Sequence, residues 1–133
     1  MFTMTVTPRF GDVDILGHIN NTVPCVWFEM GRTPLLSLFA PDFKLDKKTF
    51  PLIIAHTDYD FTGQMYISSN IEIRTWISRI GTKSFTVSHE AWQGDVLGVK
   101  GNVVIVYYDF NTSQTKPIPD DKRKLLEEHF IQK

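Results

Sequence analysis

The densest group of unusual polar residues in the sequence lies within residues 12–21, and it has the composition of a reactive loop. Asp14 is followed four residues later by His18, and Asn20 and Asn21 directly precede an apolar segment with helical spacing. A helix N-terminus exposes unpaired N–H groups and a partial positive charge, which can bind a carbonyl oxygen that becomes negative during acyl transfer. A nearby carboxylate can attack that carbonyl or deprotonate a water molecule. The loop therefore contains the parts needed to hydrolyse an activated acyl group, although the same residue types also make a turn and cap a helix.

The apolar segment that follows predicts one long buried helix. It is expected to open near Asn20–Asn21–Thr22, with Pro24 in the first turn. Its apolar residues occupy most sides, which is typical of a helix enclosed by other elements. Pro34 is expected to kink or break the helix late, after Thr33.

The remaining elements are predicted to be strands and one short helix. A segment from Thr3 to Phe10 is rich in β-branched residues and predicts a first strand. Pro41 to Phe50 is expected to be a loop, and Pro119 is expected to open a final helix with Asp120 and Asp121 near its positive end. Between this loop and the final helix, apolar and polar residues alternate with a period of two, and short turns interrupt the alternation. This pattern predicts four successive antiparallel strands at about 52–61, 67–78, 85–91 and 96–110.

This order of elements predicts an antiparallel sheet with the long helix across one face. The last strand is apolar on both faces, so the far side of the sheet also needs cover. In a chain of 133 residues, a second copy is the simplest cover, and we expect a homo-oligomer.

Composition limits the other possibilities. The chain has 42% apolar and 22% charged residues and a net charge of −1, which indicates one globular domain over residues 1–133 and gives no reason to expect nucleic-acid or membrane binding. A single cysteine, Cys25, cannot form an internal disulfide, and the N-terminus lacks the pattern of a signal peptide. We therefore expect a cytoplasmic protein. The four histidines lack metal-ligand spacing, so no metal site is predicted.

The sequence resembles a known family at two places. Asp12-Val13-Asp14-Ile15-Leu16-Gly17-His18-Ile19-Asn20-Asn21, followed by Trp27-Phe28-Glu29 and Arg32, is similar to the opening signature of hot-dog thioesterases. The nearest group is the 4-hydroxybenzoyl-CoA thioesterase-like acyl-CoA hydrolases. Residues 73–77 and 79–85 also resemble the third and fourth strands of that family.

The resemblance implies an α+β hot-dog fold, a curved antiparallel sheet around a long central helix, assembled as a homodimer or homotetramer with sites at the interface. It implies hydrolysis of an acyl-CoA without a cofactor. Asp14 would be the nucleophile or general base, with His18 and Asn21 as further catalytic residues. The expected substrate contacts are Gly17 and Asn20 in the loop, and Arg79, Lys83 and Ser84 around a later turn, where Lys83 matches a basic-Ser-Phe pattern of the family.

Several departures leave alternatives open. A related loop of plant acyl-carrier-protein thioesterases has an Asn where this chain has Leu16, and many relatives have a Tyr at Pro24, an Asp at Ser69 and a Pro near Gln64. The alternatives are a carrier-protein thioesterase, a non-catalytic acyl-thioester binding module, a dehydratase on the same fold, and an unrelated ligand-binding β-protein.

Individual residues also have less specific interpretations. Asp12 is expected to orient the loop or pair with Arg9 or Arg32, and Glu29 to act from the helix or pair with Arg32. A Cys25 nucleophile assisted by His56 or His89 is a minor alternative, because free cysteines on apolar helices are usually buried.

Overall fold

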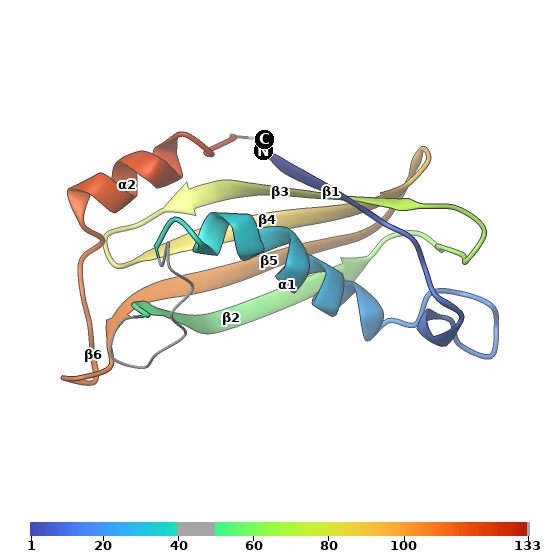
Figure 1. Ribbon diagram of the computed structural model, residues 1–133, viewed down its shortest axis with the longest axis horizontal. Coiled ribbons are helices and arrows are strands. Elements are labelled where there is room, and N and C mark those ends of the chain that lie inside the picture. Colours follow the sequence, from blue (N-terminus) through green and yellow to red (C-terminus); the bar gives the residue numbers. More distant parts are fainter. Residues whose placement is uncertain (40–49, 133) are drawn as a thin grey trace.

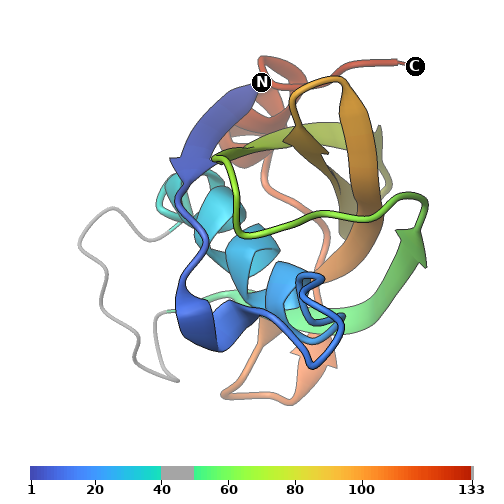
Figure 2. The ribbon, with the colours of Figure 1, turned by 90° about the vertical axis from the view of Figure 1, so that its right-hand side faces the viewer.

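The computed structural model describes residues 1–39 and 50–132, and its centre is a six-stranded antiparallel sheet that curves around one long helix (Figures 1 and 2). The helix, α1 (Val23–Leu36), lies across the concave face, and the sheet order is β1-β3-β4-β5-β2, with β6 paired to the end of β5. The other elements are β1 (Phe2–Val6), the 3-10 helix η1 (Phe10–Asp12), β2 (Leu52–Phe61), β3 (Ile71–Ile80), β4 (Ser84–Gln93), β5 (Val96–Asp109), β6 (Gln114–Thr115) and α2 (Asp120–Glu127). The predicted α+β hot-dog architecture is confirmed.

Two of the predicted strand boundaries are wrong by four residues, and the others agree within two residues. β1 ends at Val6 and does not reach Phe10, which lies in η1, because Pro8 has no N–H to donate to a ladder and the chain turns away. β3 begins at Ile71, so residues 67–70 alternate like a strand but make no ladder. Their backbone is held instead by a side chain, as described below.

The helix boundaries differ at one end. α1 begins at Val23 with Pro24 in its first turn, as predicted, but it continues past Pro34 to Leu36. Pro34 lies only two residues before the helix end, where few intrahelical hydrogen bonds remain to be lost. The predicted loop Pro41–Phe50 lies outside the described residues except for Phe50 itself.

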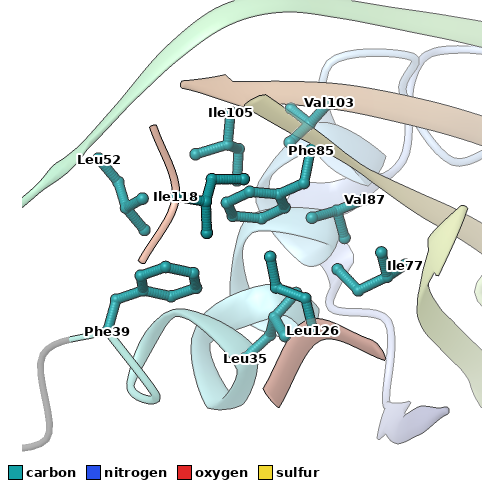
Figure 3. Close-up of a cluster of buried hydrophobic side chains, with 10 residues drawn as sticks. All are labelled: Leu35, Phe39, Leu52, Ile77, Phe85, Val87, Val103, Ile105, Ile118 and Leu126. Atoms are coloured by element: carbon teal, nitrogen blue, oxygen red, sulfur yellow. The ribbon is translucent and has the colours of Figure 1, made fainter. Parts of the chain in front are cut away.

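The inner face of the sheet carries two apolar clusters, one at each end of the strands. The cluster nearer α2 joins both helices to β2, β3, β4 and β5, and its ten side chains are drawn in Figure 3. The other cluster lies at the opposite end, under the first turns of α1, and consists of Trp27, Phe28, Met65, Ile71, Ile73, Ala91 and Val99. Burial of these side chains holds the helix in the concave face.

A row of residues at one level of the sheet separates the two clusters. Thr75, His89, Gly101 and Tyr59 are aligned partners on β3, β4, β5 and β2. The ring of Phe28 stacks on His89 with centroids 4.8 Å apart, and a Cβ at Gly101 would come within 2.8 Å of Phe28. Glycine is therefore required at 101 to let the helix approach.

Buried polar residues lie in this row and next to it: Thr75 and His89 in the row, and Arg32 on α1. The His89 Nδ1 atom lies 2.9 Å from the Thr75 hydroxyl, whereas His89 Nε2 has no partner. Arg32 is only 4% exposed, and its Nε and Nη1 atoms make no hydrogen bond. Burial and the charge of Arg32 lower the pKa of His89 to about 3, and burial also lowers the pKa of Arg32. His89 is therefore neutral in the folded protein at physiological pH.

The buried His89 predicts a specific pH dependence of stability. An unfolded histidine has a pKa near 6.5, so between about pH 6.5 and 3 the unfolded chain binds a proton that folded His89 does not. The stability present above this window is lost as the pH falls, by up to about 1.4 kcal/mol per pH unit. His89→Gln should reduce that slope, which urea unfolding at pH 7, 6 and 5 would measure. Parallel curves for the wild type and His89→Gln would contradict this assignment.

Candidate active site

The loop of residues 12–21, here called the Asp14 loop, connects η1 to α1 and is shaped by the carboxylate of Asp14. The Oδ1 atom of Asp14 accepts hydrogen bonds from the backbone N–H groups of Leu16, at 2.9 Å, and His18, at 3.2 Å. No hydrogen bond to Oδ2 is found within residues 1–39 and 50–132. One oxygen therefore orients the carboxylate, and the other is available to a substrate or a water molecule.

The backbone of the Asp14 loop closes on itself around this side chain. The Asp14 N–H donates to the His18 carbonyl at 2.8 Å, and the Gly17 N–H donates to the Asp14 carbonyl at 3.0 Å. Gly17 has φ +78°, a left-handed conformation that glycine adopts without steric cost. The tight turn thus explains the need for Gly17, which was predicted as a substrate contact and here has a conformational role.

Asp12 anchors the other side of the loop. Its carboxylate accepts hydrogen bonds from the Arg9 backbone N–H, at 2.8 Å, and from the Arg9 guanidinium, at 3.1 Å. Burial alone would raise the pKa of Asp12, but the hydrogen bonds and charge of Arg9 hold it below its usual value. The predicted pairing of Asp12 with Arg9 is confirmed, and pairing with Arg32 is not observed.

The start of α1 offers fewer free donors than predicted. The Asn20 side chain caps the turn, since its Oδ1 accepts the Thr22 N–H and hydroxyl, each at 3.0 Å. The Asn20 N–H already donates to the Asp12 carbonyl at 2.8 Å, so it is not available to an oxyanion. Pro24 has no N–H. In the described part of the chain the Asn21 N–H has no hydrogen-bond partner, and Asn21 lines the adjacent pocket.

A pocket of about 680 Å³, here called the Asp14 pocket, opens beside the loop and the first turn of α1. One wall is formed by the Asp14 loop, and the opposite wall by the end of β2 and the residues after it. The lining residues are Asp14, Leu16, His18, Ile19, Asn20, Asn21, Pro24, Phe61, Thr62, Gly63, Gln64, Met65 and Val99. A carboxylate, the free Asn21 N–H just before α1 and apolar side chains therefore meet in one cavity.

The second wall comes from residues 62–70, here called the wall segment, which connects β2 to β3. It is joined to the Asp14 loop by the Ile19 N–H, which donates to the Met65 carbonyl at 2.8 Å, and by an antiparallel bridge between His18 and Tyr66. The His18 ring meets the Tyr66 ring edge to face, with centroids 5.3 Å apart. His18 thus contacts Asp14 through its backbone, and its ring faces the wall segment.

The predicted coenzyme A contacts lie elsewhere in the chain. Lys83 and Ser84 are at the β3–β4 turn, and Arg79 lines a groove beside α2. This is the end of the sheet opposite to the Asp14 loop, separated from it by the roughly 30 Å length of β3 (Figure 1). The structure therefore does not bring Arg79, Lys83 or Ser84 into the Asp14 pocket of the same chain.

The alternative catalytic residues are not assembled. The Cys25 thiol donates to the Thr22 carbonyl at 2.8 Å, while His56 contacts Asp58 and His89 contacts Thr75. Glu29 is exposed and forms no ion pair with Arg32. Within the described residues no three His, Cys, Asp or Glu side chains are grouped as metal ligands, and no helix is long and apolar enough to cross a membrane.

Sequence reasoning missed the residues of the second wall. Phe61, Thr62, Gly63 and Met65 carry no motif, and they reach the pocket only because β2 ends, and β5 begins, beside the helix start. Met65 packs so closely over Gly98 that any side chain at 98 would collide with it. Gly98 and Gly63, where a Cβ would come within 3.0 Å of the Leu97 carbonyl oxygen, are the signals of a close approach in this region.

A curved antiparallel sheet around a central helix, with an acidic loop at the helix N-terminus, defines the protein as a hot-dog protein. The chain belongs to the thioesterase-like superfamily, whose family description matches residues 8–126.

Individual relatives agree with this assignment. A predicted thioesterase from Bacillus stearothermophilus has 41% sequence identity and a TM-score of 0.92, covering 99% of this chain and 98% of its own. The uncharacterized protein YsmA of Bacillus subtilis (strain 168) is 25% identical over 94% of this chain and 84% of its own length. A thioesterase from Thermus thermophilus, complexed with coenzyme A and Zn, has 21% identity and a TM-score of 0.82 over 96% of this chain and 92% of its own, which shows the shared fold. Together, the superfamily and the Bacillus stearothermophilus neighbour support thioester hydrolysis as the class of reaction.

Proposed function

We propose that the protein hydrolyses acyl-CoA thioesters to a free carboxylic acid and coenzyme A, with Asp14 as the general base or nucleophile. The observation that carries the proposal is the Asp14 carboxylate, oriented by two backbone N–H groups and lining a pocket at the start of α1. The thioester carbonyl would lie between Asp14 Oδ2 and the Asn21 N–H.

In the general-base form of the reaction, Asp14 takes a proton from a water molecule while the water oxygen bonds to the thioester carbon. The Asn21 N–H and the positive end of α1 stabilise the negative carbonyl oxygen of the tetrahedral intermediate. The carbonyl re-forms, the C–S bond breaks, and the thiolate takes up a proton. In the nucleophilic form, Asp14 itself bonds to the carbon, the C–S bond breaks and the leaving thiolate takes up a proton. Water then hydrolyses the resulting anhydride to the free acid and the Asp14 carboxylate. Neither form needs a metal or cofactor.

Coenzyme A is the proposed thiol because the Thermus thermophilus thioesterase of the same fold is complexed with coenzyme A. The acyl group would contact the apolar side chains of the pocket, among them Leu16, Phe61 and Met65. A carrier-protein thioester offers the same carbonyl chemistry, so comparing matched acyl groups on coenzyme A and on a carrier protein distinguishes the two substrates.

Asp14→Asn should lower kcat for acyl-CoA hydrolysis by at least about a hundredfold, as expected when a general base is removed. The amide oxygen of asparagine can still accept the Leu16 and His18 N–H groups, so the loop should keep its shape. Thiol release over aromatic, short and long acyl-CoA substrates measures the effect. Asp95→Asn, the same change in the exposed β4–β5 hairpin, is the matched control.

Retention of most wild-type turnover by Asp14→Asn would contradict the role of this carboxylate. Tight acyl-CoA binding by the wild type without thiol release would instead favour a non-catalytic binding module.

We also propose that two copies associate through their β2 edges. β2 ends the sheet order, so in the described chain its outer N–H and C=O groups face no neighbouring strand. On β2, Ile53 is 41%, Ile54 48% and Phe61 55% exposed, so large apolar side chains are exposed along this unpaired edge. Such a surface favours a self-complementary two-fold contact.

An edge contact predicts a species of twice 15.3 kDa in sedimentation experiments. Ile54→Lys should shift it toward the monomer, because a lysine on an edge strand opposes pairing. Val96→Lys, at a similarly exposed position of the β4–β5 hairpin, should not. A wild-type monomer at micromolar concentration would contradict the proposal.

Antiparallel pairing of two β2 strands would also place the β3–β4 turn of one copy at the same end as the Asp14 loop of the other. Lys83 is exposed at that turn and is proposed to contact the phosphates of coenzyme A.

Lys83→Ala should then raise KM for acyl-CoA several-fold and leave kcat and KM for short thioesters without the nucleotide nearly unchanged, because only the phosphate contact is lost. Initial-rate measurements with both substrates test this, and the short thioester serves as the internal control. Equal changes in KM for both substrates would show that Lys83 does not contact the phosphates.

A further inference from the structure

The wall segment is held by the side chain of Gln93, the last residue of β4. Gln93 Oε1 accepts the Tyr66 N–H at 2.8 Å, and Gln93 Nε2 donates to the carbonyls of Tyr66, at 2.7 Å, and Ser69, at 2.8 Å. We propose that Gln93 is a positioning residue for the active site, acting through Tyr66 and His18 on Asp14. This inference rests on the proposed function for its catalytic consequence, but its structural part can be tested separately.

The chemistry of these contacts requires a carboxamide. Tyr66 presents both its N–H and its carbonyl to Gln93, and Ser69 presents a second carbonyl, so the side chain must accept one hydrogen bond and donate two. Gln93 thus makes, at Tyr66 and Ser69, backbone hydrogen bonds of the kind that a neighbouring strand would make. A glutamate could keep only the acceptor and would place a negative charge beside two carbonyl oxygens.

The next contact joins the wall segment to the Asp14 loop. Tyr66 forms the antiparallel bridge with His18, and the two rings meet at an interplanar angle of 81°. The Ile19 N–H donates to the Met65 carbonyl, so two successive residues of each segment are paired. A displacement of Tyr66 would therefore move the backbone of His18.

The last contact joins His18 to the reactive carboxylate. The His18 N–H donates to Asp14 Oδ1 at 3.2 Å, and the His18 carbonyl accepts the Asp14 N–H at 2.8 Å. Asp14 is therefore connected to Gln93 by a continuous series of hydrogen bonds and backbone pairs through Tyr66 and His18. A shift of about 1 Å at a reacting group can reduce the rate by about a hundredfold.

Gln93 and Tyr66 do not line the Asp14 pocket. The lining residues of the wall segment, 62–65, precede Tyr66 and Ser69, the two residues that Gln93 holds, so loss of the Gln93 contacts should change the geometry of catalysis more than the binding of substrate. This separates a positioning role from a substrate contact, which would raise KM, and from a general loss of folding, which would reduce the active fraction and the melting temperature.

The test compares Gln93→Met, which keeps the length and apolar bulk of the side chain, with Gln93→Glu, which keeps its shape. Gln114→Glu, in the exposed two-residue strand β6, is the matched control. For both Gln93 variants we expect kcat for acyl-CoA hydrolysis to fall at least about tenfold, with KM within about twofold of the wild type. Thermal unfolding curves establish that the variants are folded at the assay temperature. Should a Gln93 variant fail to fold, Tyr66→Ala tests the ring contact with His18, because it removes the Tyr66 ring and keeps the backbone bridge.

Amide hydrogen exchange provides the readout that does not depend on activity. In Gln93→Met we expect faster exchange both at residues 65–69 and at residues 14–19, whereas the hairpin residues 94–96 stay as in the wild type. Faster exchange confined to 65–69, or an unchanged kcat in a folded variant of an active enzyme, would overturn the proposal. If the wild type hydrolyses no thioester, faster exchange in both segments still supports the positioning, and only the proposed function fails.

Discussion

Two backbone N–H groups donate hydrogen bonds to one oxygen of Asp14. These two bonds determine the shape of the loop on which the proposed chemistry depends. Because Leu16 and His18 both bond to Oδ1, the carboxylate is an internal part of the turn and not a free side chain. Its other oxygen is left for the pocket that opens at the start of α1. A single side chain thereby fixes both the local backbone and the position of the group proposed to act on the thioester.

The rest of the fold keeps this turn beside the helix start. Asp12, paired with Arg9, accepts the Asn20 N–H through its carbonyl and so joins the two ends of the loop. Phe28 and the apolar cluster around Met65 and Val99 hold the first turns of α1 against the sheet. The wall segment closes the other side. The site is therefore assembled from segments far apart in the sequence, and each contributes backbone contacts.

The sequence was sufficient to predict those parts of the fold and of the site that depend on local chemistry. The start of α1 beside Pro24, the Asp12–Arg9 pair and the position of Asp14 beside the helix follow from a proline in the first turn, charges and periodicity that act over a few residues. The family resemblance supplied the curvature of the sheet, which periodicity does not encode.

The parts that sequence reasoning could not predict depend on register and on long-range approach. The alignment of Thr75, His89 and Gly101 under Phe28 requires the strand pairing to be known, and so does the burial of Arg32. Residues 67–70 alternate like a strand, but this segment is held by hydrogen bonds from the Gln93 side chain to Ser69 and Tyr66, which precede Gln93 by 24 and 27 positions. No local sequence pattern reveals such contacts. The use of the Asn20 N–H by Asp12 likewise removes a donor that the sequence alone leaves open.

The most direct test of the proposed site is a crystal structure with a non-hydrolysable acyl-CoA analogue in which a methylene group separates the carbonyl from the sulfur. We expect the carbonyl oxygen within hydrogen-bond distance, about 3 Å, of the Asn21 N–H, with Asp14 Oδ2 facing the carbonyl carbon directly or through one water molecule. A carbonyl bound away from the start of α1, with Asp14 contacting neither the analogue nor such a water molecule, would contradict it.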